Sequence, residues 1–217
     1  MFGTALIMAT LAVAHFAWKY SGSNKWELVQ DKKGVQFYEL KVPGETRKQF
    51  KVVGRVKTTL NRIVATMTDT SPKACAQFVP GCVGGEILKQ WDSQSLNYVQ
   101  SFRINFKRVF SPREMVIKTQ FSQDPQTKAL LIECTAVPAP PNDCCVRVSD
   151  VNNTWRYTPL GNGQLQVEFV SNYDPGVPYF IYNRIIPRGL TGIPRHVERV
   201  FNKEQYGQTE FAWLNEG

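Results

Sequence analysis

The chain has 217 residues, of which 42% are hydrophobic, and these values fit a single folded domain with a sizeable core rather than a disordered chain. Its formal net charge of +8 favours an anionic partner, either nucleic acid or an anionic membrane surface. Long Lys/Arg runs, RNA-binding aromatic motifs and zinc-finger spacings are all missing, so no nucleic acid is expected as a partner.

Residues 1–17 carry no charged side chain and include an apolar run from Ala5 to Ala14. The run has the length of a signal-peptide core, about 7–15 residues, and the Ala-Val-Ala triplet at 12–14 resembles a cleavage site, although the usual preceding positive charge is missing. It is shorter than the roughly 20 residues that span a bilayer. A cleaved signal, an uncleaved anchor and a buried helix stay open, in that order. The first two predict an exported, periplasmic or secreted protein or a membrane-anchored one.

The five cysteines are an odd number, so no complete disulfide framework uses them all. If the chain is exported, Cys75 and Cys82 are the pair expected to bridge. Cys144 and Cys145 are expected to remain ordinary thiols, because adjacent cysteines rarely bridge. The scarcity of histidine argues against a metal site, and no cofactor is expected.

After a linker at 18–23, a domain is predicted over 24–206, followed by a tail at 207–217. Val35–Leu40 and Lys48–Lys57 alternate as a hairpin. Helical spacing then appears at 58–67, behind a threonine cap, and a second short helix is predicted at 73–78.

Strand patterns follow, and the clearest is Tyr98–Lys107, where Phe102, Ile104 and Phe106 alternate with polar residues. Met115 to Phe121 forms the facing stripe. The remaining predicted strands are 128–137, 146–157 and 164–173, and the Asn162-Gly163 step between the last two is typical of a tight hairpin turn.

The C-terminal third begins with an Asp174-Pro175-Gly176 turn and continues as an amphipathic helix. Pro187, Gly189 and Gly192 predict that this helix is broken, with pieces at 179–186 and 194–203. One stripe is apolar: Tyr182, Ile186, Leu190, Ile193, Val197 and Phe201. The basic residues on the other side are Arg184, Arg188, Arg195, Arg199 and Lys203, which either form a solvated surface or dock on anionic membrane.

These elements predict an α+β fold: a curved antiparallel β-sheet of about nine strands wrapped around a C-terminal helix, with two short helices inserted early. Such a sheet leaves an interior that side chains or a ligand must fill.

Several short motifs, in this order and spacing, resemble the StAR-related lipid transfer (START) domain over residues 24–203. They are Trp26, Asp31, Gly34, Val35 and Tyr38; Ser111-Pro112-Arg113-Glu114 and Val116; Val146-Arg147; Trp155, Tyr157 and Pro159; Asp174-Pro175-Gly176; and Pro178 with Asn183. The resemblance implies a helix-grip fold, in which a closed apolar tunnel under the C-terminal helix holds one lipid. Known members carry sterols, phospholipids, ceramides or carotenoids.

Sterol-binding members of that family often pair an acid with an arginine inside the tunnel, at positions that correspond here to Gln100 and Thr119. The ion pair is therefore absent, although both side chains can hydrogen-bond a lipid. Arg113 is expected to fix its turn rather than to touch the ligand. The residues predicted to contact the lipid are Gln100, Phe102, Ile104, Phe106, Met115, Ile117, Thr119, Trp155, Tyr157, Tyr182 and Ile186; the alternative for each is ordinary core packing.

The leading hypothesis is a monomeric, non-enzymatic lipid carrier or lipid sensor. Catalysis is not expected, because His15 and His196 are the only histidines and the predicted interior has no obvious acid/base pair. The alternatives are an enzyme on a related scaffold, such as an aromatic polyketide cyclase, and a quinone-binding chaperone.

Overall fold

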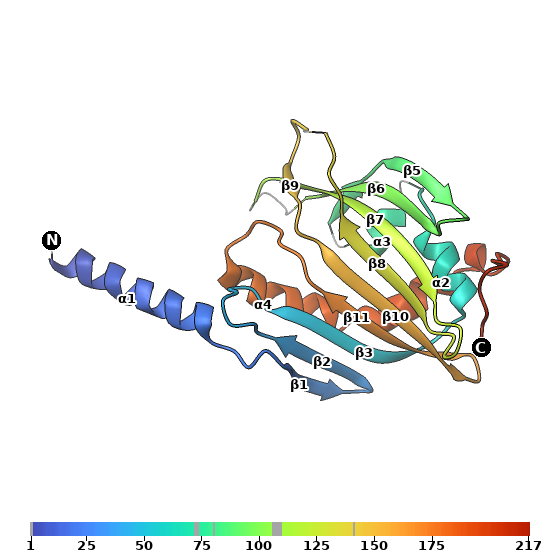
Figure 1. Cartoon of the computed structure of the whole chain (residues 1–217), viewed down its shortest axis with the longest axis horizontal. Coiled ribbons are helices and arrows are strands. Elements are labelled where there is room, and N and C mark those ends of the chain that lie inside the picture. The colour runs from blue at the N-terminus through green and yellow to red at the C-terminus, as the bar shows by residue number, and fades with distance from the viewer. Residues whose placement is uncertain (1, 72–73, 80, 106–109, 141) are drawn as a thin grey trace.

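The computed structural model describes the chain except residues 1, 72–73, 80, 106–109 and 141, and it has one large sheet with helices packed on one face (Figure 1). The eleven strands run in the order β1-β2-β3-β11-β10-β8-β7-β6-β4, with β5 paired to β6 and β9 to β7. The strands are β1 (Trp26–Lys32), β2 (Val35–Leu40), β3 (Gln49–Lys57), β4 (Cys82–Gly84), β5 (Ile87–Asp92), β6 (Asn97–Ile104), β7 (Arg113–Gln123), β8 (Leu130–Ala136), β9 (Val146–Val148), β10 (Asn152–Gly161) and β11 (Gln164–Ser171).

The helices confirm the predicted order of sheet, early helical insertion and C-terminal cover. The two short helices lie between β3 and β4, and the last two α-helices lie across the concave face of the sheet (Figure 1). The helices are α1 (Phe2–Tyr20), α2 (Leu60–Met67), α3 (Ala74–Phe78), α4 (Tyr179–Leu190) and α5 (Ile193–Phe201), followed by a 3-10 turn at Glu204–Tyr206. The α+β prediction is therefore confirmed.

Local sequence signals explain several of these elements. The Thr59 side chain accepts a hydrogen bond from the Arg62 amide and begins α2, as its sequence predicts. Asn162 and Gly163 both have positive φ, 54° and 68°, which closes the β10–β11 hairpin with the backbone that an Asn-Gly step favours.

The predicted break in the C-terminal helix is confirmed, but the first piece is longer than expected, because α4 continues through Pro187 to Leu190 rather than ending at Ile186. Asn183, one turn earlier, holds α4 to the chain before β3: its Oδ1 accepts from the Lys48 amide at 2.9 Å and its Nδ2 donates to the Thr46 carbonyl at 3.1 Å. These contacts keep the helix in place although the proline ring removes one backbone donor. The interruption falls at Thr191–Gly192, directly before α5.

The region expected to be one strand at 146–157 is two strands. Val146–Val148 forms β9, which pairs in parallel with the start of β7, and β10 begins only at Asn152. Val148 and Val151 are both buried beside Met115 and Ile117. The segment from Val148 to Val151 therefore covers one end of the sheet's inner face.

The C-terminal residues after 206 pack on the domain. The Glu216 carboxylate accepts hydrogen bonds from the Leu60 and Asn61 amides at 2.7 and 2.8 Å, which satisfies free donors at the start of α2. Phe211, Trp213 and Leu214 contact the main apolar cluster.

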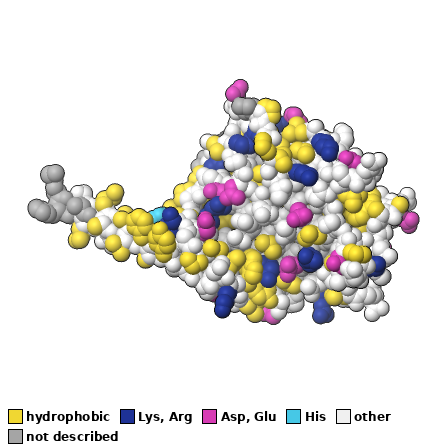
Figure 2. All heavy atoms as spheres, viewed as in Figure 1, with side chains coloured by type: hydrophobic (Ala, Val, Ile, Leu, Met, Phe, Trp, Pro, Cys, Tyr) yellow, Lys and Arg dark blue, Asp and Glu magenta, His cyan; other side chains and the backbone are white. Residues whose placement is uncertain are grey.

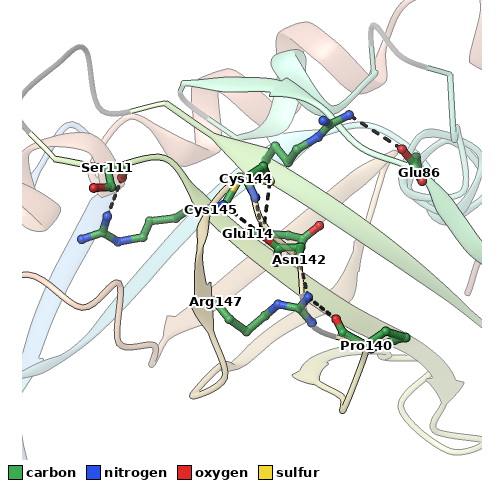
Figure 3. The surroundings of a disulfide bond; sticks show 10 residues. Glu86, Ser111, Glu114, Pro140, Asn142, Cys144, Cys145 and Arg147 are labelled. Carbon is green, nitrogen blue, oxygen red and sulfur yellow. Dashed lines mark hydrogen bonds and ion pairs between the residues drawn. A yellow bond between two sulfur atoms is a disulfide. The ribbon is translucent and has the colours of Figure 1, made fainter.

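Two disulfides are present, and one of them corrects a prediction. Cys75–Cys82 joins α3 to β4, as expected, and Cys134 is the free cysteine. Cys144 and Cys145, expected to be thiols, are bonded to each other. The Asn142 Oδ1 atom accepts from both cysteine amides, at 3.2 and 2.9 Å, and this turn brings the two sulfurs together (Figure 3).

Helix α1 projects away from the domain (Figure 1), and hydrophobic side chains cover much of its visible surface (Figure 2). Its last turn is attached: the Trp18 Nε1 donates to the Thr46 carbonyl at 2.8 Å, and the Trp18 ring stacks on Tyr179 at the start of α4. Within the described residues, no helix has the length and apolar character required to cross a membrane.

Candidate functional site

The inner face of the sheet brings together the side chains predicted to contact a lipid. In the β6–β7 pair, Tyr98 lies opposite Thr119, Gln100 opposite Ile117, and Phe102 opposite Met115. Alternation along each strand then places all of these side chains on one face. Phe106 lies outside the described residues.

The predicted residues divide among three apolar clusters. Ile104, Met115, Ile117 and the half-buried Phe102 belong to the cluster at the β9 end of the sheet. Tyr157 and the half-buried Trp155 belong to the main cluster, beneath α2 and α5. Tyr182 and the half-buried Ile186, from α4, pack with Phe37, Phe50 and Val52. Gln100 and Thr119 are also buried, so all the described members of the predicted set are inside or partly inside the domain.

Besides Gln100, a row of three polar side chains crosses this mainly apolar face. Tyr98 on β6 is paired with Thr119 on β7, and Thr119 with Cys134 on β8. The Tyr98 hydroxyl donates to the Met67 carbonyl at 2.6 Å, which ties the row to the end of α2. Burial raises the pKa of Cys134 to about 11, so its sulfur carries a proton at neutral pH.

Two buried tyrosine hydroxyls, those of Tyr157 and Tyr182, make no hydrogen bond of good geometry among the described residues, although Ser171 and the Tyr173 backbone lie close to Tyr182. Tyr157 is 0% exposed and Tyr182 is 1% exposed. Burial raises the pKa of Tyr157 well above its usual value and that of Tyr182 to about 12, so both stay neutral donors. Sequence periodicity indicated that these side chains point inward, but no sequence signal shows that their hydroxyls lack partners.

Arg113 connects the sheet to the beginning of α4. Its side chain is buried, and it donates from Nε to the Pro175 carbonyl at 2.7 Å and from Nη2 to the Gly176 carbonyl at 3.1 Å; it also donates to the Ser111 carbonyl. The arginine thus fixes the turn, as expected from the sequence. Among the described residues it is the one charged residue that is buried.

Two hollows lie outside this inner face. One, of about 580 Å³, is lined by Lys203, Glu204, Gln205 and Gln208. The other, of about 340 Å³, is lined by Val42 and by polar residues around Arg47 and Asp150. Neither includes a residue predicted to contact the lipid.

The predicted basic docking residues are all exposed: Arg184 and Arg188 on α4, and Arg195 and Arg199 on α5. Arg199 contacts the His196 ring at 3.1 Å, so part of the α5 group has a local partner. On α4 the two arginines share the exposed surface with Phe180 and Ile185, which are 63% and 54% exposed.

Comparison with solved structures shows which fold this is. The chain superimposes on human STARD10 with a TM-score of 0.71 and 12% identity, covering 88% of this chain and 78% of that one. It superimposes on a fragment of a STAR-related lipid transfer protein from Xanthomonas axonopodis with a TM-score of 0.66 and 20% identity, covering 81% and 96%. The chain therefore has a START-like fold. Human StAR-related lipid transfer protein 5 agrees, at a TM-score of 0.65 and 16% identity over 91% and 95% of the two chains.

Sequence comparison adds a bacterial relative of this START-like chain. An uncharacterized protein of Pseudomonas aeruginosa is 25% identical over 187 residues, which cover 83% of this chain and 89% of that protein. No family model matches the sequence.

Proposed function

We propose that the chain binds one hydrophobic lipid between the inner face of its sheet and helices α4 and α5, and that it carries or senses this lipid without chemical catalysis. The START-like fold, shared with proteins named for lipid transfer, supports this function most directly. The binding energy is adequate, because burying about 400 Å² of ligand at roughly 25 cal/mol/Å² yields on the order of 10 kcal/mol before ordering costs.

The interior chemistry favours a carrier over the alternative of a cyclase. The described inner-face groups that can titrate include the phenols of Tyr98 and Tyr157 and the thiol of Cys134, and burial raises the pKa of each. Such groups are poor general bases near neutral pH. They hold a bound molecule by hydrogen bonding and apolar contact instead.

Native mass spectrometry of the purified protein is expected to show a one-to-one complex with a lipid. Extraction and analysis of that lipid then identify it, and a quinone in the extract would favour the chaperone. Protein stripped of lipid is expected to take up one molecule from vesicles. Failure both to retain and to take up any lipid would contradict the proposed function.

We further propose that the chain acts at a membrane surface, with residues 1–17 as an anchor and α4 beside it. The exposed apolar side chains of α1, among them Leu6, Leu11 and Val13, support insertion into a bilayer surface. The Trp18–Tyr179 stack joins α1 directly to α4, whose exposed face combines Phe180 and Ile185 with Arg184 and Arg188.

Vesicles containing phosphatidylglycerol are expected to bind the full chain, and added salt is expected to weaken this binding. At about 1 kcal/mol per basic residue, the double substitution Arg184→Gln with Arg188→Gln should reduce the affinity about thirtyfold. Leu11→Asp should weaken the vesicle binding that remains at high salt, because it places a charge on the apolar helix α1. Cosedimentation measures both.

The matched control removes the same charge from the other side of the sheet, with Arg55→Gln and Arg156→Gln, both exposed there. These changes should have a much smaller effect. Equal losses of vesicle affinity for both arginine pairs would show that the attraction to anionic lipid is non-specific. The mass of the mature protein tests the anchor separately: a mass that lacks residues 1–17 would overturn it.

A further inference from the structure

The Tyr157 hydroxyl is one of the buried polar groups without a hydrogen-bond partner among the described residues, and its residue belongs to the main apolar cluster. The side chain is 0% exposed, and its oxygen has no hydrogen-bond partner among the described residues. A buried hydroxyl without a partner costs about 1–3 kcal/mol, and each such group in a folded protein calls for an explanation.

Apolar side chains surround Tyr157, and the polar group that influences it is the uncharged thiol of Cys134. Cys134 lies at the edge of the same cluster and is close enough to influence the pKa of Tyr157. Cys134 pairs with Thr119, and Thr119 with Tyr98. Since the Tyr98 proton is already donated to the Met67 carbonyl, Tyr157 offers the free donor of this group and Thr119 and Cys134 offer adaptable ones.

We propose that Tyr157, with Cys134 and Thr119, forms the subsite for the polar group of the bound lipid, and that this subsite selects a lipid whose buried polar group is an uncharged hydroxyl or carbonyl. This inference rests on the proposed lipid-binding function. It assigns to Tyr157 the donation of a hydrogen bond to the oxygen of that group.

Charge is the basis of the selection. Arg113 is the one buried charged residue among those described, and its guanidinium already donates to the carbonyls of Ser111, Pro175 and Gly176. A phosphate or carboxylate placed beside Tyr157 would therefore lose its hydration without gaining a counter-ion, at a cost of several kcal/mol. A hydroxyl or carbonyl loses much less and gains the missing hydrogen bond.

The test compares two lipids with the same acyl chains, dioleoylglycerol and dioleoylphosphatidate, together with squalene, which has no polar group. Each is offered to lipid-stripped full-length protein, and bound lipid is counted by native mass spectrometry. The wild-type chain is expected to prefer dioleoylglycerol over dioleoylphosphatidate by at least about tenfold. Tyr157→Phe is expected to weaken dioleoylglycerol binding about three- to tenfold, the value of one hydrogen bond, and to leave squalene binding unchanged.

A second readout separates ligand recognition from a structural role. Tyr157→Phe keeps the ring and removes only the unsatisfied oxygen, so the lipid-free variant should unfold at the same temperature as the wild type or a higher one. The control is Tyr38→Phe, which removes a hydroxyl that bonds Gln36 on the opposite face and should leave the lipid preference unchanged.

The possible results of these experiments separate a failure of the Tyr157 subsite from a failure of the proposed lipid-binding function. Binding of none of the three lipids would overturn the subsite, and it would overturn the proposed function as well where native mass spectrometry of the purified and vesicle-treated protein also shows no bound lipid. Equal binding of dioleoylglycerol and dioleoylphosphatidate, or a Tyr157→Phe variant with wild-type affinities, would overturn the subsite alone. A large fall in the unfolding temperature of lipid-free Tyr157→Phe would also overturn it, because the hydroxyl would then have a partner within the protein.

Discussion

Arg113→Ala is expected to lower the free energy of unfolding by about 3 kcal/mol or more and to loosen the start of α4. The guanidinium donates to three backbone carbonyls, and hydrogen bonds to a charged group contribute about 1.5–3 kcal/mol each in favourable cases. Alanine leaves these carbonyls without their donors and creates a void beside Gly176. Urea unfolding measures the stability, and hydrogen exchange over residues 174–190 measures the loosening.

Two further substitutions test whether the loss of stability in Arg113→Ala is specific to the hydrogen bonds of this guanidinium. Arg113→Lys keeps the charge but cannot reproduce the planar array of donors, so an intermediate loss is expected. Arg103→Ala, on the neighbouring strand, removes a partly exposed arginine whose distance to Glu86 is 3.8 Å, and it should cost less than about 1 kcal/mol. Equal losses for Arg113→Ala and Arg103→Ala, or unchanged exchange at α4, would show that the turn does not depend on Arg113.

Arg113 also bears on the exchange of the proposed lipid. The bonded carbonyls belong to the turn that leads into α4, and the buried Tyr182 of α4 reaches the inner face. Loosening that turn should therefore speed both uptake and release of lipid, with a smaller change in affinity. Transfer rates between vesicles would show this as faster kinetics in Arg113→Ala.

Much of the fold could be predicted because its elements have strong local patterns. Alternation in β6 and β7 identified the inner face from Gln100 to Thr119, and the apolar stripe of the C-terminal third identified the covering helices. Such patterns indicate which side of a helix or strand is buried, and reading them requires no knowledge of which segments pack against that side.

The errors came from contacts between distant segments. Pro187 predicts that the first C-terminal helix ends at Ile186, but Asn183 is bonded to the chain before β3 and α4 continues to Leu190 before the break. The parallel pairing of β9 with β7 joins segments about thirty residues apart, beyond the reach of any local period. The Cys144–Cys145 bond likewise depends on the turn that Asn142 stabilises.

The candidate site could be predicted only in part from the sequence, because it too depends on contacts between distant segments. Periodicity placed Tyr157 inside, but a missing hydrogen bond is a property of all its neighbours together. The contact between β3 and α5 at Gly54 is another such property, since the sequence showed only that this glycine belongs to the same stripe as Phe50 and Val52.

Gly54→Ala is expected to destabilise the protein by about 1–2 kcal/mol, although alanine is usually the better strand residue by roughly 0.5–1 kcal/mol. A Cβ at position 54 would lie 2.6 Å from Cγ and 3.1 Å from Cβ of Pro194, at the start of α5. The proline ring cannot rotate away, so α5 must move away from β3, against which it packs. The steric term therefore exceeds the gain in strand propensity, and the midpoint of urea unfolding should fall.

The double variant Gly54→Ala with Pro194→Ala tests this cause directly. Pro194→Ala removes the ring carbon that would overlap and leaves the milder 3.1 Å approach, so the second substitution should restore about 1 kcal/mol of the loss in the Gly54→Ala background. In the wild-type background Pro194→Ala should instead cost stability slightly, because proline suits the first turn of a helix. Simple additivity of the two changes would show that α5 does not press on β3 at Gly54. A positive coupling would establish that the absence of a side chain at this one strand position lets the closing helix approach the sheet.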